Sequence, residues 1–341
     1  MTAVTTTAPR QMSVTTSISD RAWGSEPPRL GLRAYITCFK GIVWREVLRY
    51  LHQRERFLSA LVRPLIWLFI FAAGFRQTLG VSIIPPYETY VLYEEFIAPG
   101  LITMILLFNA MQSSLSMVYD RETGTMRTLL VSPFPRSFLL LSKLFGGVSV
   151  ALLQSYAFVF VAYFWGIQPP PITQVKLFTF YDAPAWLGGV FGTMTDPVIT
   201  PLFSVPELLQ PFAGYLTLVP ALILAGLMLG SLALFMSSVI RQLENFAGVM
   251  NFVIFPMFFA SSALYPLWRI REASPLLYEV CRLNPFTYAV ELVRFSLYGQ
   301  VDTVSLAIVV GFMVVFLAAA VFAYNPSKGL IARRGGPGGS A

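Results

Sequence analysis

Long apolar runs dominate the pattern of hydrophobic and polar positions along this chain. A helix needs roughly 20 apolar residues to cross about 30 Å of hydrocarbon. Six segments meet that length, namely residues 57–76, 96–118, 137–166, 213–238, 246–266 and 303–324. The third is longer than one crossing requires, which indicates a tilted helix or one that extends beyond the bilayer. The pattern therefore predicts an all-α integral membrane protein with six transmembrane helices.

The segment before the first span, residues 31–54, has a different periodicity. Its apolar residues recur at steps of three and four, the spacing of one helix face. They are Leu32, Ile36, Phe39, Val43, Val47 and Leu51. Basic residues complement this face, a pattern typical of a helix that lies in the headgroup layer with its apolar side down. Because a span follows directly, we favour an interfacial helix over an ordinary amphipathic packing helix.

Two further segments fall on the outer side of the predicted topology. Residues 168–212 contain eight prolines, which disfavour regular helices. The aromatic residues among them favour an ordered outer cap over the alternative, an unstructured linker. Residues 267–300 are too charged to cross the bilayer but are apolar at intervals. They predict one or two short helices that dip back from outside, surrounded by protein or water.

Charge placement predicts the orientation of the spans and the nature of the two ends. With the N-terminus in the cytoplasm, 18 of the 24 Lys and Arg residues lie on the inner side, so both termini are expected inside. Residues 1–28 are rich in Thr, Ser, Pro and Arg, and they lack the apolar centre of a signal peptide. We expect them to form a disordered cytoplasmic tail. Residues 326–341 predict a second tail, which is basic and Gly-rich.

Composition supports a surface that faces lipid. The 341 residues are 56% hydrophobic and 12% charged, with a mean hydropathy of +0.66. A soluble domain carries roughly twice that charged fraction. The net charge of +7 is compatible with nucleic-acid binding. However, the basic residues gather at the cytoplasmic flanks of the spans, so the expected partner is membrane lipid and no nucleic acid.

The sequence contains no recognisable source of energy for transport. None of its four lysines follows a glycine and precedes Ser or Thr, so the P-loop pattern of an ATPase is missing. A proton-coupled carrier needs ionisable groups within its spans, and by the boundaries above the second, fourth, fifth and sixth contain none. With one histidine and two cysteines, neither a zinc motif nor a disulfide is expected. If the protein pumps, a partner must supply the work.

The inner loop at residues 120–132 is where a partner could act. Alternating charges open the loop, and Met126, Leu129 and Leu130 follow at helical spacing before Pro133. A short helix of this kind is suited to docking into a groove on a soluble protein. A solvated loop whose charges anchor the spans fits equally well. The residues alone do not choose between the two.

A resemblance favours the docking helix. The relevant motifs are Tyr-Glu-Glu-Phe-Ile-Ala-Pro-Gly at 93–100, Asp-Arg-Glu-Thr-Gly-Thr at 120–125, Leu-Leu-Val-Ser-Pro-Phe-Pro-Arg at 129–136, Phe255-Pro256 through Tyr265-Pro266, Asn284-Pro285-Phe286-Thr287-Tyr288, Arg294, and Arg63-Pro64 with Trp67. In this order and spacing the chain resembles the ABC-2 family of permeases over residues 30–325. The transmembrane domain is then expected to span residues 29–325.

The resemblance implies an assembly and assigns roles to residues. Two such permeases pair, here as a homodimer, and each binds one of two cytoplasmic ATPase subunits that hold ATP and Mg; this chain itself binds no cofactor. The implied coupling helix, which sits in a cleft of the ATPase, carries Arg121, Glu122, Gly124, Thr125, Met126, Arg127, Leu129 and Leu130. The implied interface helix, which also contacts the ATPase, carries Arg45, Glu46 and Arg49. The implied outer re-entrant hairpin, between the fifth and sixth spans, carries Asn284, Pro285, Tyr288 and Arg294. The chain departs from the family pattern at 168–212, where the connection is usually short.

The resemblance also implies export of an amphiphile, such as a drug, lipid or glycolipid, across a bacterial inner membrane. Candidate residues along its path are Phe108, Asn109, Gln112, Phe255 and Phe259. For the polar members we favour structural hydrogen bonds between helices, which are common in membrane bundles. The alternative function is an ATP-independent channel or facilitator. A membrane-embedded enzyme is a third reading, but the spans offer no clustered carboxylates for catalysis.

Overall fold

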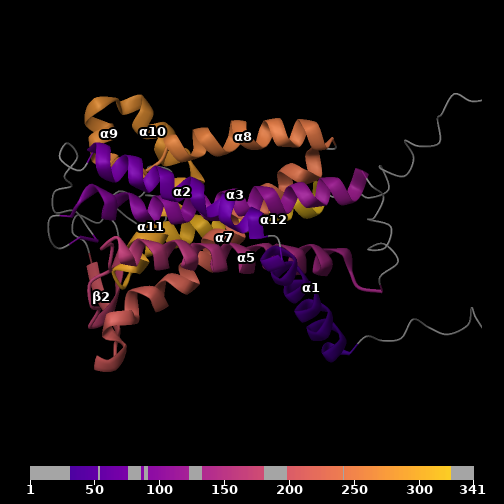
Figure 1. Ribbon diagram of the computed structural model, residues 1–341, viewed down its shortest axis with the longest axis horizontal. Coiled ribbons are helices and arrows are strands. Elements are labelled where there is room, and N and C mark those ends of the chain that lie inside the picture. The colour runs from indigo at the N-terminus through magenta and orange to yellow at the C-terminus, as the bar shows by residue number, and fades with distance from the viewer. Residues whose placement is uncertain are drawn as a thin grey trace, which may run out of the picture.

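The computed structural model describes residues 31–52, 54–75, 86–87, 91–122, 133–179, 198–240 and 242–323. It is a bundle of helices in which most of the long helices run in broadly the same direction (Figure 1). The helices are α1 (Leu32–His52), α2 (Arg54–Phe75), α3 (Tyr93–Glu122), α5 (Arg136–Phe164), α7 (Ala213–Val239), α8 (Leu243–Phe259), α9 (Leu267–Ala273), α10 (Pro275–Leu283), α11 (Pro285–Leu297) and α12 (Thr303–Ala323), with the short 3-10 helix η1 (Glu207–Phe212) before α7.

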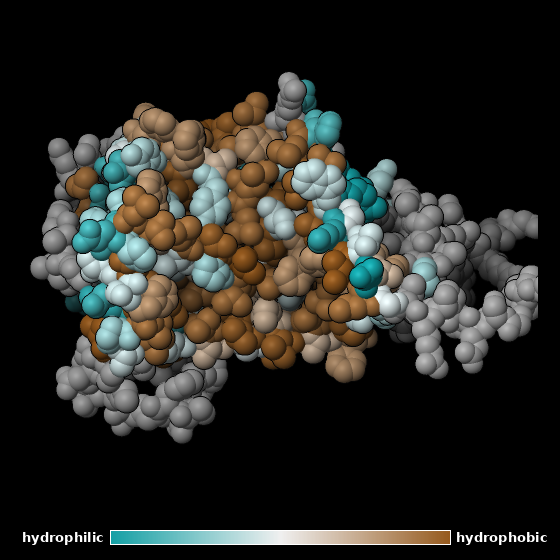
Figure 2. Space-filling model, turned by 90° about the horizontal axis from the view of Figure 1, so that it is seen from below, coloured by the Kyte–Doolittle hydropathy of each residue, from teal (hydrophilic) through white to brown (hydrophobic). Residues whose placement is uncertain are grey.

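Within the described residues, four helices are long and apolar enough to cross a membrane. The qualifying stretches are Tyr93–Tyr119, Ser137–Phe164, Glu207–Val239 and Thr303–Ala323. They confirm four of the six predicted spans as long apolar helices. The other two coincide with shorter apolar stretches, Ala60–Phe71 in α2 and Leu243–Phe259 in α8. The face that Figure 2 shows has a broad hydrophobic band across its middle, with hydrophilic residues gathered towards both ends.

Several helix boundaries differ from the prediction by three residues or more, among them the start of α3 and the end of α8. Helix α3 begins at Tyr93 rather than at residue 96, so Glu94 and Glu95 lie inside its first turn and Glu94 is buried. These two carboxyl groups lie just before the predicted span 96–118, which itself contains no ionisable residue. Helix α8 ends at Phe259 rather than at residue 266. Its apolar run continues, but Ser261 closes a turn by donating to the carbonyl oxygen of Phe258 and accepting from the backbone N–H of Ala263.

Helix α7 lies at the centre of the bundle and packs against α3, α5, α11 and α12. A Cβ added to Gly230 would clash with Cδ1 of Leu144 on α5. A Cβ on Gly226 would lie 3.2 Å from Val148 on the same helix. The small-residue pair thus allows two helices of one chain to approach closely, as expected for apolar helices that cannot rely on the hydrophobic effect for association in lipid.

A small sheet corrects the expectation of an all-helical chain. Strands β1 (Gln174–Thr179), β2 (Val198–Ser204) and β3 (Gln300–Asp302) form a sheet in the order β2-β1-β3. β1 pairs antiparallel with β2 and parallel with β3, with Leu177 opposite Val301. The sheet was missed because β3 has three residues and gains its hydrogen bonds from a strand far away in sequence. The described part of the 168–212 segment is therefore ordered.

The segment predicted to hold one or two short helices contains three. Helices α9 and α10 are short, and α11 is almost fully buried between α3, α7 and α12. Helix α1 extends from the opposite end of the bundle from α9, α10 and β2 (Figure 1). The two ends of the molecule thus carry different candidate sites.

Candidate functional site

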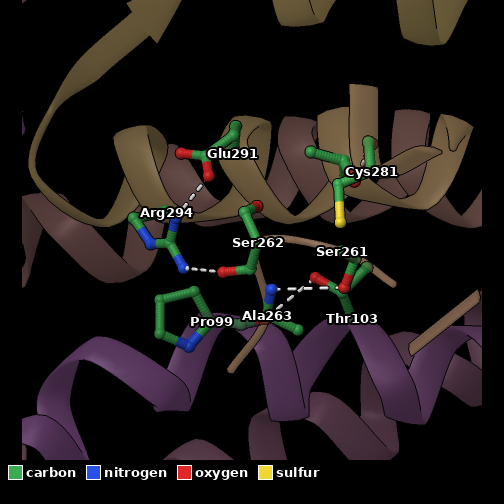
Figure 3. Close-up of polar contacts among 9 residues, drawn as sticks. Pro99, Thr103, Ser261, Ser262, Ala263, Cys281, Glu291 and Arg294 are labelled. Carbon is green, nitrogen blue, oxygen red and sulfur yellow. Dashed lines mark hydrogen bonds and ion pairs between the residues drawn. The ribbon is translucent and has the colours of Figure 1, made fainter. Parts of the chain in front are cut away.

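The connection between α8 and α9 packs directly on the first turns of α3. The hydroxyl of Tyr93 donates to the carbonyl oxygen of Leu264 at 2.9 Å. A Cβ added to Gly100 would lie 2.7–2.8 Å from the carbonyl oxygen, Cα and Cβ of Ala263. Only glycine lets the connection come this close to the helix. Figure 3 shows residues 261–263 held between α3 below and α11 above.

Arg294 of α11 closes this arrangement from the other side. The residue is 3% exposed. The guanidinium donates from Nη2 to the carbonyl oxygen of Ser262 at 2.7 Å and forms an ion pair from Nη1 with Glu291 (Figure 3). Its Cζ lies 4.2 Å from the centre of the Phe96 ring. A buried guanidinium needs such partners because burial of an unpaired charge is costly.

Asn284 performs a similar role at the start of α11. Its side-chain oxygen accepts from the backbone N–H of Phe286, which caps the helix, and Pro285 occupies the first helical position. Its amide donates to the carbonyl oxygens of Met257 and Ala260, both at 2.7 Å. The hydroxyl of Tyr288 donates to the carbonyl oxygen of Arg282 at 2.8 Å. Asn284 thus joins α11 to α8, Tyr288 joins it to α10 and Arg294 joins it to the α8–α9 connection, while Pro285 starts the helix.

Beside these contacts lies a cavity of about 200 Å³, which we call the Arg294 cavity. Helices α9, α10 and α11, the end of β3, the start of α12, Phe96 and Tyr87 line it. Its charged lining residues are Arg271, Arg282, Arg294, Glu291 and Asp302.

Asp302 is buried at the start of α12. Its two carboxylate oxygens accept from the backbone N–H groups of Val304 and Ser305, at 3.2 and 3.0 Å, which makes it the helix cap. Desolvation by burial raises the pKa of this carboxyl to about 6, and the hydrogen bonds from Ser305 and Val304 oppose the shift. No pattern in the sequence marked Tyr87, Trp268 or Glu291 as a site residue, and Asp302 was not predicted either. A cap signal in Asp-Thr-Val-Ser was available for Asp302.

At the other end of the bundle, α1 packs on α5 through aromatic residues. Tyr35 contacts Phe134 and Phe138, and Phe39 contacts Phe145, with ring centres 5.0–5.6 Å apart. Leu32, Ile36, Trp44 and Leu51 of α1 remain exposed. The predicted helix is therefore present with an apolar exposed side, and its place in the headgroup layer remains a prediction.

The three predicted interface residues of α1 form one small charged group. Glu46 forms ion pairs with Arg45 at 3.1 Å and with Arg49 at 3.5 Å. Glu46 is largely shielded, whereas both arginines are exposed. Glu46 and Arg49 also line a cavity of about 80 Å³, together with Asn109 and Gln112 of α3. Two predicted path residues therefore lie beside α1.

Asn109 also belongs to a hydrogen-bond network between helices, because it donates to Gln154 of α5, which accepts from Tyr50 of α1 at 2.9 Å as well. The other three path residues do not line that cavity. Phe108 lies under the guanidinium of Arg63. Phe255 and Phe259 stack on each other on an exposed side of α8, and Phe259 contacts Trp67 of α2.

The predicted coupling residues fall mostly outside the described part of the chain. Arg121 and Glu122 form the last turn of α3. Gly124, Thr125, Met126, Arg127, Leu129 and Leu130 lie outside the described residues, as do the tails at 1–28 and 326–341. The helix predicted there remains a prediction.

The chain is similar to one family model and to several known transport permeases. A family model described as "ABC-2 type transporter" matches residues 37–196 and 198–298. The transport permease ycf38 of Cyanophora paradoxa is 26% identical over 243 residues, 70% of this chain and 66% of that protein. The inner membrane transport permease YadH of Escherichia coli (strain K12) is 24% identical over 290 residues, 84% of this chain and 93% of that protein. YbhR of the same organism, whose name assigns it to a multidrug ABC transporter, is 32% identical over 143 residues, 41% of this chain and 37% of that protein.

Proposed function

Since this chain belongs to the ABC-2 type transporter family, we propose that it is the membrane permease subunit of an ATP-driven exporter of an amphiphilic substrate. The observation that carries the proposal is the family match over most of the chain, joined to a bundle with an apolar band. The sequence lacks a P-loop. The energy for transport is therefore assigned to a separate ATPase subunit that binds ATP and Mg.

In this proposal the protein spans the membrane six times, with both termini in the cytoplasm. Helices α2 and α8 supply the first and fifth spans, although their apolar stretches are shorter than those of the other four. The shorter stretches are accommodated if residues flanking them reach the headgroups. Helix α1 lies at the inner surface, and α9–α11 form the re-entrant hairpin at the outer side. Support comes from their positions at opposite ends of the bundle (Figure 1) and from the excess of Lys and Arg on the inner side.

The assembly we propose has two copies of this chain and two ATPase subunits in a bacterial inner membrane. YadH, a relative that this chain matches over 93% of its length, is named as an inner membrane transport permease. ATP binding would close the ATPase subunits and draw the two 120–132 segments together, and the long helices would carry this movement to the outer side. Such coupling requires that the ATPase bind one conformation of the permease more tightly than the other. The exposed pair Arg45 and Arg49 on α1 offers a second contact with the ATPase.

Outward movement of a drug, lipid or glycolipid is the substrate class that we propose. The relative YbhR is named as a multidrug ABC transporter permease, which supports an amphiphile. The exposed rings of Phe255 and Phe259 offer apolar contacts for such a molecule at the seam between two copies.

The proposal is tested by isolating the tagged, full-length chain from its native membrane together with whatever binds it. We expect an ABC ATPase to co-purify in equal amount, with ATP hydrolysis that orthovanadate inhibits. Vesicles that contain the complex should move a fluorescent amphiphile only when ATP is present. Equal transport without ATP by the chain alone would instead support a channel or facilitator and would overturn the proposal.

A further inference from the structure

The outer segment formed by β2 and η1 exposes apolar side chains. Leu202 and Phe203 of β2 are 53% and 59% exposed, and Leu208 and Phe212 of η1 are 85% and 60% exposed. We call these four residues the outer apolar patch. Glu207 is the only charged residue in β2 and η1. An exposed surface of this composition indicates that the patch has a partner.

Packing fixes this segment in place. A Cβ added to Gly214, at the start of α7, would lie 2.6 Å from the carbonyl oxygen of Leu297 and 2.9 Å from Cβ of Pro169. The backbone N–H of Ile172 donates to the carbonyl oxygen of Gln210 in η1 at 3.1 Å. These contacts hold η1 and the start of α7 against the chain that follows α5 and against the end of α11. The fold itself therefore turns the patch outwards.

The apolar run of α7 continues into η1 without a break. The stretch Glu207–Val239 has 33 residues, about 50 Å of helix at 1.5 Å per residue, whereas the hydrocarbon layer is about 30 Å thick. Phe212, Leu216 and Pro220 lie at steps of four and are all exposed, so one apolar side runs from the span to η1. Trp165, which follows α5, is also exposed, and tryptophan is typical of the membrane–water interface. In the membrane placement proposed above, this length brings the patch to the outer headgroup layer.

The free edge of the sheet limits how deeply the segment can lie. Because the strand order is β2-β1-β3, the backbone groups on the outer edge of β2 have no strand partner among the described residues. Such groups cannot face hydrocarbon, which offers them no hydrogen bonds. Headgroups and water do. β2 is therefore suited to the headgroup layer, with the side chains of η1 reaching the acyl chains.

A second copy of the chain is a poor fit to the patch. Figure 1 shows β2 on the lower side of the bundle and α8 on the upper side. Phe255 and Phe259 of α8 are assigned above to the seam between two copies. A copy at that seam leaves β2 and η1 facing away from it, towards lipid. Since β2 and η1 contain no Lys or Arg, apolar contact and not charge provides the attraction to the membrane surface.

We propose that β2 and η1 form an interfacial anchor in the outer leaflet, in which β2 lies among the headgroups and Leu208 and Phe212 insert between the acyl chains. The partner is the lipid surface itself, and no particular headgroup is required. β1 joins β2 to β3, which leads into α12. The anchor thus ties the start of α12 to the surface of the bilayer. The inference rests on the membrane placement in the proposed function, but not on the ATPase.

Spin labelling of the full-length protein in phosphatidylcholine vesicles tests the anchor. In a Cys38→Ser background the remaining cysteine, Cys281, is buried. Leu208→Cys and Phe212→Cys each receive a nitroxide. Power saturation then compares the accessibility of the nitroxide to O₂, which concentrates in acyl chains, with its accessibility to a water-soluble nickel chelate. We expect the ratio of O₂ to nickel accessibility at both positions to exceed the ratio at Glu207→Cys at least about threefold.

Two labelled positions serve as references. Glu207→Cys changes the exposed charged residue of η1 itself, which should face water. Val315→Cys lies at a 60% exposed position in α12 and reports the lipid value. All four changed side chains are exposed, so each variant should melt like the unlabelled protein.

Two results would overturn the anchor. A ratio at Leu208→Cys and Phe212→Cys no higher than at Glu207→Cys would mean that the patch faces water. Low accessibility to both reagents, together with spin–spin broadening, would mean that a second copy covers it. If Val315→Cys also favoured the nickel chelate, the membrane placement in the proposed function would fail, so the two failures are distinguishable.

Discussion

Arg294 on α11 donates a 2.7 Å hydrogen bond to the backbone carbonyl of Ser262, a residue of the connection between α8 and α9. The same guanidinium pairs with Glu291 and lies over Phe96 of α3. One side chain therefore joins three parts of the bundle that are distant in sequence. Motifs that are far apart in the sequence are therefore neighbours in the fold. The 261–264 connection contacts Tyr93 and Gly100 on the side away from Arg294. Asn284 donates to two backbone carbonyl oxygens at the end of α8.

Replacing Arg294 by methionine should destabilise the protein strongly. The change leaves Glu291 without its cation and the carbonyl oxygen of Ser262 without its donor, and breaking a buried pair from one side costs on the order of 3 kcal/mol. The free energy of unfolding in mixed detergent micelles measures the effect. Arg45→Met removes a pair whose cation is 60% exposed, so it should change the free energy by less than about 1 kcal/mol. Equal losses in the two variants would show that the Arg294 contacts contribute no more than a surface pair.

The close approach of Gly100 to Ala263 predicts a cost for one methyl group. In Gly100→Ala the new Cβ meets backbone atoms at 2.7–2.8 Å, which move only with the whole connection. Overpacking of this kind costs about 1–3 kcal/mol. In the control Gly248→Ala, on α8, the new Cβ meets nothing within 4 Å, so stability should stay the same or rise by up to about 1 kcal/mol. Thermal melting of both purified variants gives the comparison, and a stable Gly100→Ala variant would contradict the packing.

Asn284 offers a way to separate helix capping from the contacts with α8. Asn284→Asp keeps the oxygen that caps α11 but removes the amide that donates to Met257 and Ala260, whereas Asn284→Ala removes both. We expect losses of about 1 kcal/mol for capping and a further 1–2 kcal/mol for the two buried carbonyl oxygens left without a donor. Ser274→Ala, which removes only the exposed cap of α10, should cost no more than about 1 kcal/mol. If Ser274→Ala and Asn284→Ala lower the melting temperature by the same amount, the contacts of Asn284 with α8 do not stabilise the fold.

The buried carboxyl of Asp302 predicts a dependence of stability on pH. Its pKa is raised from 3.8 to about 6 by desolvation, with a smaller contribution from Glu291 in the same cavity. The folded state therefore binds a proton more tightly than the unfolded state, and the contribution of this group to stability falls as pH rises from about 4 to about 6 and is constant above. A shift of this size corresponds to roughly 3 kcal/mol.

Comparison with Asp302→Asn isolates that contribution. The variant has no proton to lose and keeps one oxygen for the cap, so wild type should lose up to about 3 kcal/mol relative to it between pH 4 and pH 6. Melting of both proteins over this range measures the difference. Gly248→Ala, which changes no titratable group and places its Cβ in open space, serves as the control and should keep a constant difference from wild type over this range. A constant difference between wild type and Asp302→Asn across the range would contradict the raised pKa.

Periodicity and hydropathy predicted the long helices well. The expected limits 137–166, 213–238 and 303–324 agree within two residues with α5, α7 and α12. Such segments can be predicted from sequence because lipid requires an unbroken apolar run and complete backbone hydrogen bonding inside each helix. The end of α8 was misplaced because residues 260–266 stay apolar while a turn at Ser261 stops the helix.

Tertiary contacts explain what the sequence did not predict. Strand β3 pairs with β1, which lies more than a hundred residues earlier, so no local pattern marks it. The Arg294 cavity assembles Trp268, Glu291 and Asp302 from three separate elements, and their proximity arises only when α9, α11 and β3 pack together. Arg294 itself was identified through a motif, but its burial could not be inferred from a segment with several charges.

Reversal of charge at Glu122, the last residue of α3, tests how the permease is driven. In our proposal the 120–132 segment transmits the closure of the ATPase, and Glu122 forms a charged contact with it. Glu122→Lys replaces attraction by repulsion at that contact. The complex should still assemble through α1 and hydrolyse ATP, but ATP-dependent movement of a fluorescent amphiphile in vesicles should fall at least about tenfold.

The control Glu279→Lys makes the same reversal at an exposed site on α10, at the other end of the bundle, and should transport normally. Because melting of the purified chain should not change in either variant, a loss of transport is separated from a loss of folding. Normal transport by Glu122→Lys would mean that the ATPase does not drive the permease through this residue.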